Sequence, residues 1–329
     1  MDILATSYFL IFWIIAATLL LTGIAIARHI KHYNNSWTRL SVTFGQTQGT
    51  PLARSDSKSA SRFFALLTEL QIPCTIEFWV AGVGETIHVA VSVPISKRKK
   101  IIGLLEYVWP KIQIGSANDH DFWLESATGT GAELAGGSFD LRFPYVLPLD
   151  SNPEHSVVTE LFRALSNLKT LGEGALLQWV IRPANRRLLQ DSAEHLRQLA
   201  AGSYRPSRHI PEHFLVTPET IKQLETKIRQ PLLAVNARLL CYDARGEARS
   251  LLERLASPLV RPAAHPTLHN HLRFTPTTRT APLLELAATG AFDPVHEMIL
   301  NADEVAAYCY LPSGNPSPKL ARHTQPFRL

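Results

Sequence analysis

The chain has 329 residues, of which 46% are hydrophobic, so it is long enough to bury more than one modest core. Its formal net charge is only +5, and a bias this small does not by itself indicate a nucleic-acid-binding protein. The three cysteines, Cys74, Cys241 and Cys309, lie far apart and lack the spacing of a metal site or a disulfide framework, which suits a reducing compartment.

The first segment predicts a membrane anchor. Residues 3–27 carry no charged side chain, and about twenty apolar residues in a helix span the roughly 30 Å hydrocarbon core of a bilayer. Arg28 and Lys31 follow the apolar run, so the chain after it should stay in the cytoplasm. A cleaved signal peptide would need a basic start and a shorter apolar core. We therefore predict a single-pass anchor over residues 1–33 in the inner (cytoplasmic) membrane.

The next segments predict a linker and a first α+β domain. Residues 34–58 are polar and rich in Ser and Gln, which favours a linker. The domain should cover residues 59–202. Its predicted elements, in chain order, are a helix at 59–70, a hairpin of two strands around 81–86, a helix at 96–107 capped by Ser96, a strand from 112, a glycine-rich flexible loop at 129–138, a strand at 139–149, a helix at 154–169, a strand at 175–183 and a polar helix at 185–202.

A loop rich in Pro and His at residues 203–213 predicts a domain boundary. The second, smaller α+β domain should cover residues 203–300, and residues 301–329 predict an irregular tail. The predicted elements of this domain are a helix from Pro218 to Arg229, a strand at 232–243, a helix at 246–259 and a strand at 269–274. The order of elements predicts an α+β fold in which a transmembrane helix precedes two ferredoxin-like units.

One basic run is a candidate contact surface. Four consecutive cations begin the helix at 96–107, where they oppose the helix dipole. They form either a solvated helix end or a contact with anionic headgroups or DNA. No aromatic residue interleaves with them as in a single-strand binder, so lipid or protein contact ranks above DNA. The residues predicted to touch membrane or nucleic acid are Arg28, Lys31, Lys97, Arg98, Lys99 and Lys100.

Other polar groups favour ordinary structural roles. His265, His269 and His271 could converge on a metal, but no Cys, Asp or Glu falls within their loop, so a polar loop is favoured. Residues 119–121 predict a polar turn, and Glu173, flanked by glycines, a turn that enters a strand. No nucleophile and base are tied together by a sequence signature, which leaves a hydrolase poorly supported. We therefore predict neither enzymatic activity nor a cofactor nor a metal.

The order of several segments resembles the N-terminal, membrane-anchored region of conjugation-type motor ATPases of bacterial type IV secretion systems. Each segment alone is mostly a strand or helix pattern, and the resemblance rests on their shared order over residues 61–313. The segments are SRFFALLTEL (61–70), TIEFWVAGVGETIHVAVSVP (75–94), YVWPKIQI (107–114), GEGALLQWVIRPA (172–184), PLLAVNARLLCYD (231–243) and LNADEVAAYCYLPS (300–313).

The resemblance implies a membrane-anchored accessory or assembly component of a type IV secretion or conjugative DNA-transfer apparatus. Its implied partners are a P-loop motor ATPase or other secretion-system subunits, membrane lipid, DNA and further copies of itself. In the family a nucleotide-binding motor follows this region, but G-x-x-x-x-G-K-[ST] occurs nowhere in this sequence. Two alternatives stay open: a membrane-tethered nucleic-acid-binding module, and the N-terminal half of a split or truncated motor.

Overall fold

The computed structural model describes residues 36–44, 53–81, 86–116, 131–143, 145, 147–149, 157–168, 172–184, 190, 194, 197–198, 218–260 and 269–311. The predicted anchor, with Arg28 and Lys31, lies outside these ranges. No helix within them is long and apolar enough to cross a membrane. The predicted α+β class is confirmed, because helices pack on one sheet whose strand pairs are antiparallel.

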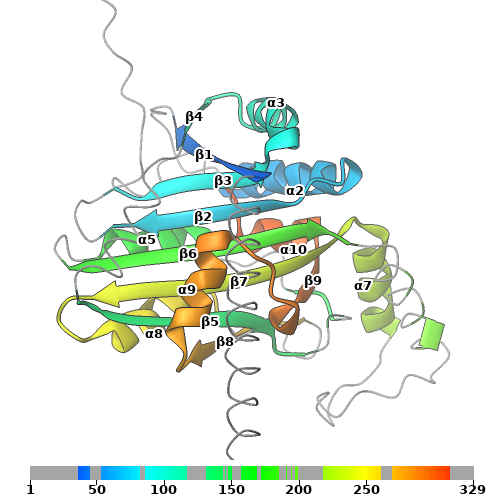
Figure 1. The fold of residues 1–329 in the computed structure, drawn as a ribbon. Helices are drawn as coiled ribbons and strands as arrows, with labels where there is room; N and C mark the ends of the chain where they lie inside the picture. The colour runs from blue at the N-terminus through cyan, green and yellow to red at the C-terminus, as the bar shows by residue number, and fades with distance from the viewer. Residues whose placement is uncertain are drawn as a thin grey trace, which may run out of the picture.

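The sheet has two halves that join side by side (Figure 1). The four strands of the first half lie in the order β4-β1-β3-β2, and those of the second half in the order β6-β7-β5-β8. The first half consists of β1 Trp37–Phe44, α2 Ala53–Glu69, β2 Cys74–Val80, β3 His88–Pro94, the 3-10 turn Ile95–Lys97, α3 Arg98–Val108 and β4 Ile112–Ser116. The second half consists of β5 Glu133–Leu141, α5 Val157–Ser166, β6 Glu173–Pro183, α7 Pro218–Arg229, β7 Leu232–Asp243, α8 Ala248–Ala256 and β8 Leu272–Thr277.

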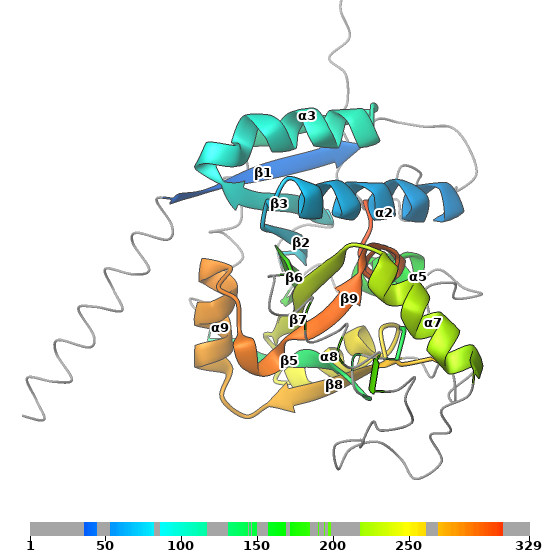
Figure 2. The same cartoon turned by 90° about the vertical axis from the view of Figure 1, so that its right-hand side faces the viewer.

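Four further elements complete the described chain, one of them the 3-10 turn Pro294–His296. α9 Thr280–Thr289 follows β8, and β9 Met298–Asn301 pairs with β7 off the main path of the sheet. α10 Ala302–Tyr308 then packs against α2. Figure 2 shows α9 on one side of the sheet and α2, α5 and α10 on the other.

Both halves share one hydrophobic core. β2 and β6 pair in register, with Phe78 opposite Leu177 and Ile76 opposite Trp179, and all four side chains are buried in the same cluster. Side chains from α2, α3, α5, α8 and α10 enter this cluster as well. Residues in between, such as Trp79 and Leu176, point to the opposite face and form a smaller core beneath α9. The alternation follows from the two-residue period of a strand, which lets β2 and β6 bury both faces.

The predicted linker at 34–58 contains strand β1, which lies between β4 and β3 in the sheet. Leu40 and Val42 point into the core and are fully buried, whereas Arg39, Ser41 and Thr43 alternate with them on the other face. The polar half of this alternation made the segment resemble a linker. Helix α2 also begins earlier than predicted, at Ala53.

The glycine-rich loop predicted at 129–138 is wrong over its second half, because β5 begins at Glu133. Gly136 and Gly137 lie inside the strand, where a larger residue would not fit. A Cβ atom on Gly137 would lie 2.6 Å from the backbone oxygen of Thr275 in the neighbouring strand β8. These glycines therefore permit close strand packing and do not provide loop flexibility.

Two helix ends also differ from prediction. Ser96 lies within a 3-10 turn, and Lys97 occupies the N-cap position of α3 without a side-chain cap. The tail predicted from residue 301 begins with α10, because Asn301 and Glu304 form a capping box that starts a helix.

The sheet also crosses the boundary predicted near residue 203, since β5 pairs with both β7 and β8.

Candidate functional site

The predicted basic run is exposed at one end of the first half. Residues 95–100, which we call the basic turn, comprise the 3-10 turn after β3 and the first residues of α3. Arg98, Lys99 and Lys100 are exposed, Lys97 is half-buried, and the apolar Ile95 is 51% exposed. Among described residues, no ion pair involves any of the four cations. No described carboxylate therefore neutralises the charge of the turn.

The local sequence explains this exposure. Ile101, Leu104 and Leu105 form the buried face of α3, so the four cations fall on its first turn and outer side. The corresponding helix of the second half, α8, starts differently. There the Asp243 carboxylate accepts hydrogen bonds from the backbone N–H groups of Arg245 and Glu247. Cations at the start of α3 repel the helix dipole, whereas carboxylates at the start of α8 complement it.

A buried polar cluster joins the two halves on the face beneath α9. Gln178 of β6 donates from its Nε2 to Glu77 Oε1 of β2 at 2.6 Å and to the backbone oxygen of Ala287 in α9 at 2.8 Å. Arg39 of β1 completes the cluster, with its Nε 3.0 Å from Glu77 Oε2. Glu77 and Gln178 are fully buried. The only signal for this cluster in the sequence is weak, namely that Glu77 and Gln178 each interrupt an otherwise apolar stretch of a predicted strand.

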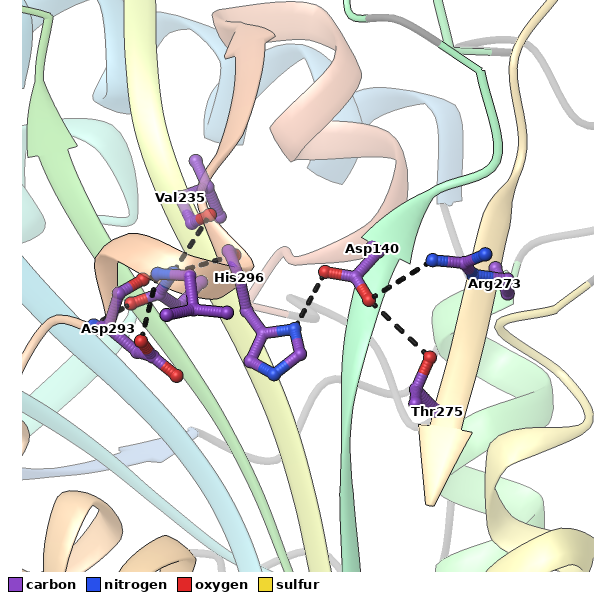
Figure 3. Close-up of polar contacts among 8 residues, drawn as sticks. Asp140, Val235, Arg273, Thr275, Asp293 and His296 are labelled. Carbon is purple, nitrogen blue, oxygen red and sulfur yellow. Dashed lines mark hydrogen bonds and ion pairs between the residues drawn. The ribbon is translucent and has the colours of Figure 1, made fainter. Parts of the chain in front are cut away.

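A second polar cluster lies on β5, β7, β8 and the 3-10 turn Pro294–His296 (Figure 3). His296 Nδ1 is 2.8 Å from Asp140 Oδ1, and Arg273 Nη2 is 3.7 Å from Asp140 Oδ2. Asn236 holds the turn in place, since its Nδ2 donates to the backbone oxygens of Asp293 and His296 at 2.8 Å each. This arrangement orients the His296 imidazole. Among the described contacts, no Ser, Thr or Cys side chain hydrogen-bonds to that ring as a nucleophile would.

A buried ion pair connects α7 to α10. Lys227 Nζ lies 3.0 Å from Glu304 Oε1, and both side chains are 2% exposed. Burial raises the pKa of Glu304 and lowers the pKa of Lys227, while the attraction between the two groups opposes both shifts. Glu304 Oε1 also accepts the backbone N–H of Leu149 at 2.6 Å, and Oε2 accepts that of Asn301 at 2.7 Å. The pair thus ties a helix, a loop and a capping box together.

The other sequence candidates do not converge in the described chain. No group of His, Cys, Asp and Glu there has the geometry of a metal site. Burial, with the nearby Arg142, lowers the pKa of His271, while residues 119–121 and His265 lie outside the described ranges. Glu173 is the first residue of β6 and is buried, although a turn was predicted there, and its Oε2 is 3.6 Å from Arg254 Nη2. All three cysteines are buried free thiols.

Comparison with known proteins found no family model and no curated protein that matches this chain. Among the residues that the structure describes, the basic turn combines positive charge with the exposed apolar side chain of Ile95.

Proposed function

We propose that this protein is a membrane-anchored assembly component of a type IV secretion or conjugative DNA-transfer apparatus and is not a catalyst by itself. Residues 1–33 would cross the inner membrane once, and the rest of the chain would lie in the cytoplasm. The partners would be a P-loop motor ATPase, other subunits of the apparatus and further copies of the chain.

Within the cytoplasmic part we propose two ferredoxin-like units, residues 37–116 and 133–277. The support is a repeated order of elements. Each half runs β-α-β-β-α-β, with α7 added before the third strand of the second half. The strands of each half also lie in the same spatial order. From the outer edge of the sheet inward, this order is the fourth, first, third and second strand of the half. A ferredoxin-like unit has the same β-α-β-β-α-β sequence of elements.

The observation that carries the functional proposal is the spatial arrangement of the segments that resemble the motor family. Those at 75–94, 172–184 and 231–243 form β3, β2, β6 and β7, which are consecutive neighbours in the sheet. The segments at 61–70 and 300–313 meet as α2 and α10, where the Ser61 hydroxyl donates to Asp303. Pieces far apart in the chain thus form one contiguous block. Such a block favours a shared structural unit over chance similarity of separate strands.

The test is co-purification of the tagged full chain from detergent-solubilised membranes of its native host. We expect a P-loop ATPase or another secretion-system subunit to co-purify, and the isolated chain to show no ATP hydrolysis. A preparation without any such subunit, or one in which the chain itself hydrolyses ATP, would contradict the proposal.

The second candidate function is a membrane-tethered nucleic-acid-binding module, which the four consecutive cations of the basic turn favour. Four phosphate contacts would give a slope of log K against log salt of about −3.6, since each contact contributes roughly −0.9 on duplex DNA. A slope of that size, lost when residues 97–100 are neutralised, would favour this second function. The split-motor alternative predicts instead that the co-purifying ATPase completes this chain in a fixed one-to-one complex.

A further inference from the structure

We propose that the basic turn, residues 95–100, docks on anionic lipid headgroups of the leaflet from which the anchor emerges. This inference rests on the membrane anchor of the proposed function and specifies which surface faces the bilayer. It assigns a lipid partner to the turn, where sequence reasoning leaves lipid, protein and nucleic acid open.

The pairing of β1 places the basic turn beside the entry of the anchor. β1 begins at Trp37, which lies opposite Pro94 in the antiparallel register with β3. The basic turn starts at the very next residue, Ile95. Residues 28–36 connect the apolar run to β1, and at about 3.5 Å per residue they reach no more than roughly 30 Å. Trp37, which pairs with the end of β3, therefore lies within roughly 30 Å of the point where the anchor would leave the bilayer.

The chemistry of the turn fits a charged bilayer. Lys97, Arg98, Lys99 and Lys100 are consecutive, and none is ion-paired to a described residue. Each Lys or Arg near an anionic leaflet strengthens binding about fivefold, so four together act over several hundredfold. Ile95 is 51% exposed beside them, and an apolar side chain among cations suits insertion between headgroups.

The composition of the turn disfavours a nucleic acid as the partner. The turn has no aromatic side chain on which a base could stack, because it reads ISKRKK. Trp37, which lies opposite Pro94 beside the turn, is half-buried, and the exposed Tyr107 lies at the opposite end of α3. The start of α8, the corresponding position in the second half, is capped by carboxylates. The positive surface therefore lies on the first half of the sheet, which follows the anchor in the chain.

The experiment places an environment-sensitive dye on the turn of the full chain. Ser96 is exposed, whereas the natural thiols of Cys74, Cys241 and Cys309 are fully buried with pKa values raised by burial, so Ser96→Cys is labelled selectively. The labelled chain is reconstituted into vesicles of phosphatidylcholine alone or mixed with phosphatidylglycerol. We expect a blue-shifted emission, protected from an aqueous quencher, only in vesicles with phosphatidylglycerol. About 1 M salt, where the Debye length is about 3 Å, should reverse the shift.

A charge-matched pair of variants supplies the control. Changing all four cations of the turn to Gln should abolish the shift. A variant that loses the same charge from exposed positions of the second half should keep it. The control substitutions are Lys222→Gln, Arg229→Gln, Arg245→Gln and Arg249→Gln. A label at the exposed Thr278 of the far edge should respond to neither lipid.

Four outcomes would overturn the inference. One is an equal shift in both kinds of vesicle, and another is a shift that survives neutralisation of the turn. The third is a shift produced by an oligonucleotide and not by phosphatidylglycerol, which would assign the turn to nucleic acid. The fourth is extraction of the chain from the vesicles by carbonate, which would contradict both the membrane anchor and this inference. A normal lipid response without a co-purifying ATPase would instead count against the proposed function alone.

Discussion

At the scale of single residues, the most consequential contacts are buried polar groups that join distant parts of the chain. Lys227 and Glu304 are an example, since each is almost inaccessible and each is the other's charged partner. Moving two charges out of water costs several kcal/mol per ion, and their attraction repays this only in part. Such a pair adds little net stability to the fold. Its main effect is to determine how α7 and α10 pack together.

Lys227→Met should therefore lower the free energy of unfolding by about 3–5 kcal/mol, because it leaves the Glu304 carboxylate buried without its partner. The double variant Lys227→Met/Glu304→Gln should recover most of this loss, since no uncompensated charge remains. Denaturant unfolding of the full chain in detergent measures both. Equal stability of the single and double variants would show that lost packing, and not the stranded charge, is responsible.

The same variant should have a characteristic pH dependence. Burial already raises the pKa of Glu304, and removing Lys227 removes the attraction that opposes this shift. The folded state then holds a proton that the unfolded state releases above its own pKa of about 4.3. The cost of Lys227→Met is thus absent below that pKa and grows as pH rises through the window up to the folded-state pKa. Unfolding measured at acidic and at neutral pH should show a smaller difference from the wild type at acidic pH.

Asn236 and His296 offer a comparison within one cluster. Asn236 bonds three backbone groups around the turn Pro294–His296, so Asn236→Ala should cost about 2–3 kcal/mol by leaving them unpaired. His296→Ala removes a partly exposed contact with Asp140 and should cost less than about 1 kcal/mol. Thermal unfolding of the two variants tests the order, and a larger loss for His296→Ala would contradict it.

These residue roles explain what sequence could and could not predict about the candidate site. The surface position of residues 97–100 follows from local pattern, because four charges in a row cannot all face a core. The roles of Glu77, Gln178 and Asn236 depend on partners far away in the chain. Periodicity within one segment carries no information about such partners. The sequence therefore predicted the surface and missed the buried polar groups.

At the scale of elements, strands with complete apolar patterns were predicted closely and those with mixed faces were not. β7 has the predicted bounds Leu232–Asp243 because both of its faces are buried over its whole length. β1 was missed since half of its residues are polar, and α10 because a seven-residue helix carries too few turns for a clear period. Short or half-exposed elements are stabilised mainly by tertiary contacts, which the sequence alone does not display.

The pairing of β6 with β7 includes one position that requires glycine. Gly174 lies opposite Tyr242, and a Cβ atom on it would be 2.3 Å from the Tyr242 ring. Gly174→Ala should lower the free energy of unfolding by about 1–3 kcal/mol through overpacking. In a Tyr242→Leu background the same change should cost much less, which a double-mutant cycle measures. A coupling energy near zero would show that the ring moves aside freely.

At the scale of the whole molecule, the seam between β2 and β6 determines how the two halves behave. The seam buries apolar side chains of both strands in one core and places Glu77 against Gln178 on the other face. Separating the halves would expose a long strand edge on each side together with part of that core. The halves should therefore unfold together, although each repeats the same order of elements.

Hydrogen exchange tests this cooperativity. Gly174→Ala changes only the second half, yet it should speed exchange of the slowest amides of β3 and of β7 by the same factor. A loss of about 1–3 kcal/mol corresponds to roughly 5- to 150-fold faster exchange when both strands open through global unfolding. Peptides covering β3 and β7, followed by mass spectrometry in the wild type and the variant, give the two factors directly. Faster exchange in β7 with β3 unchanged would mean that the seam opens without unfolding the first half, and that each unit is stable by itself.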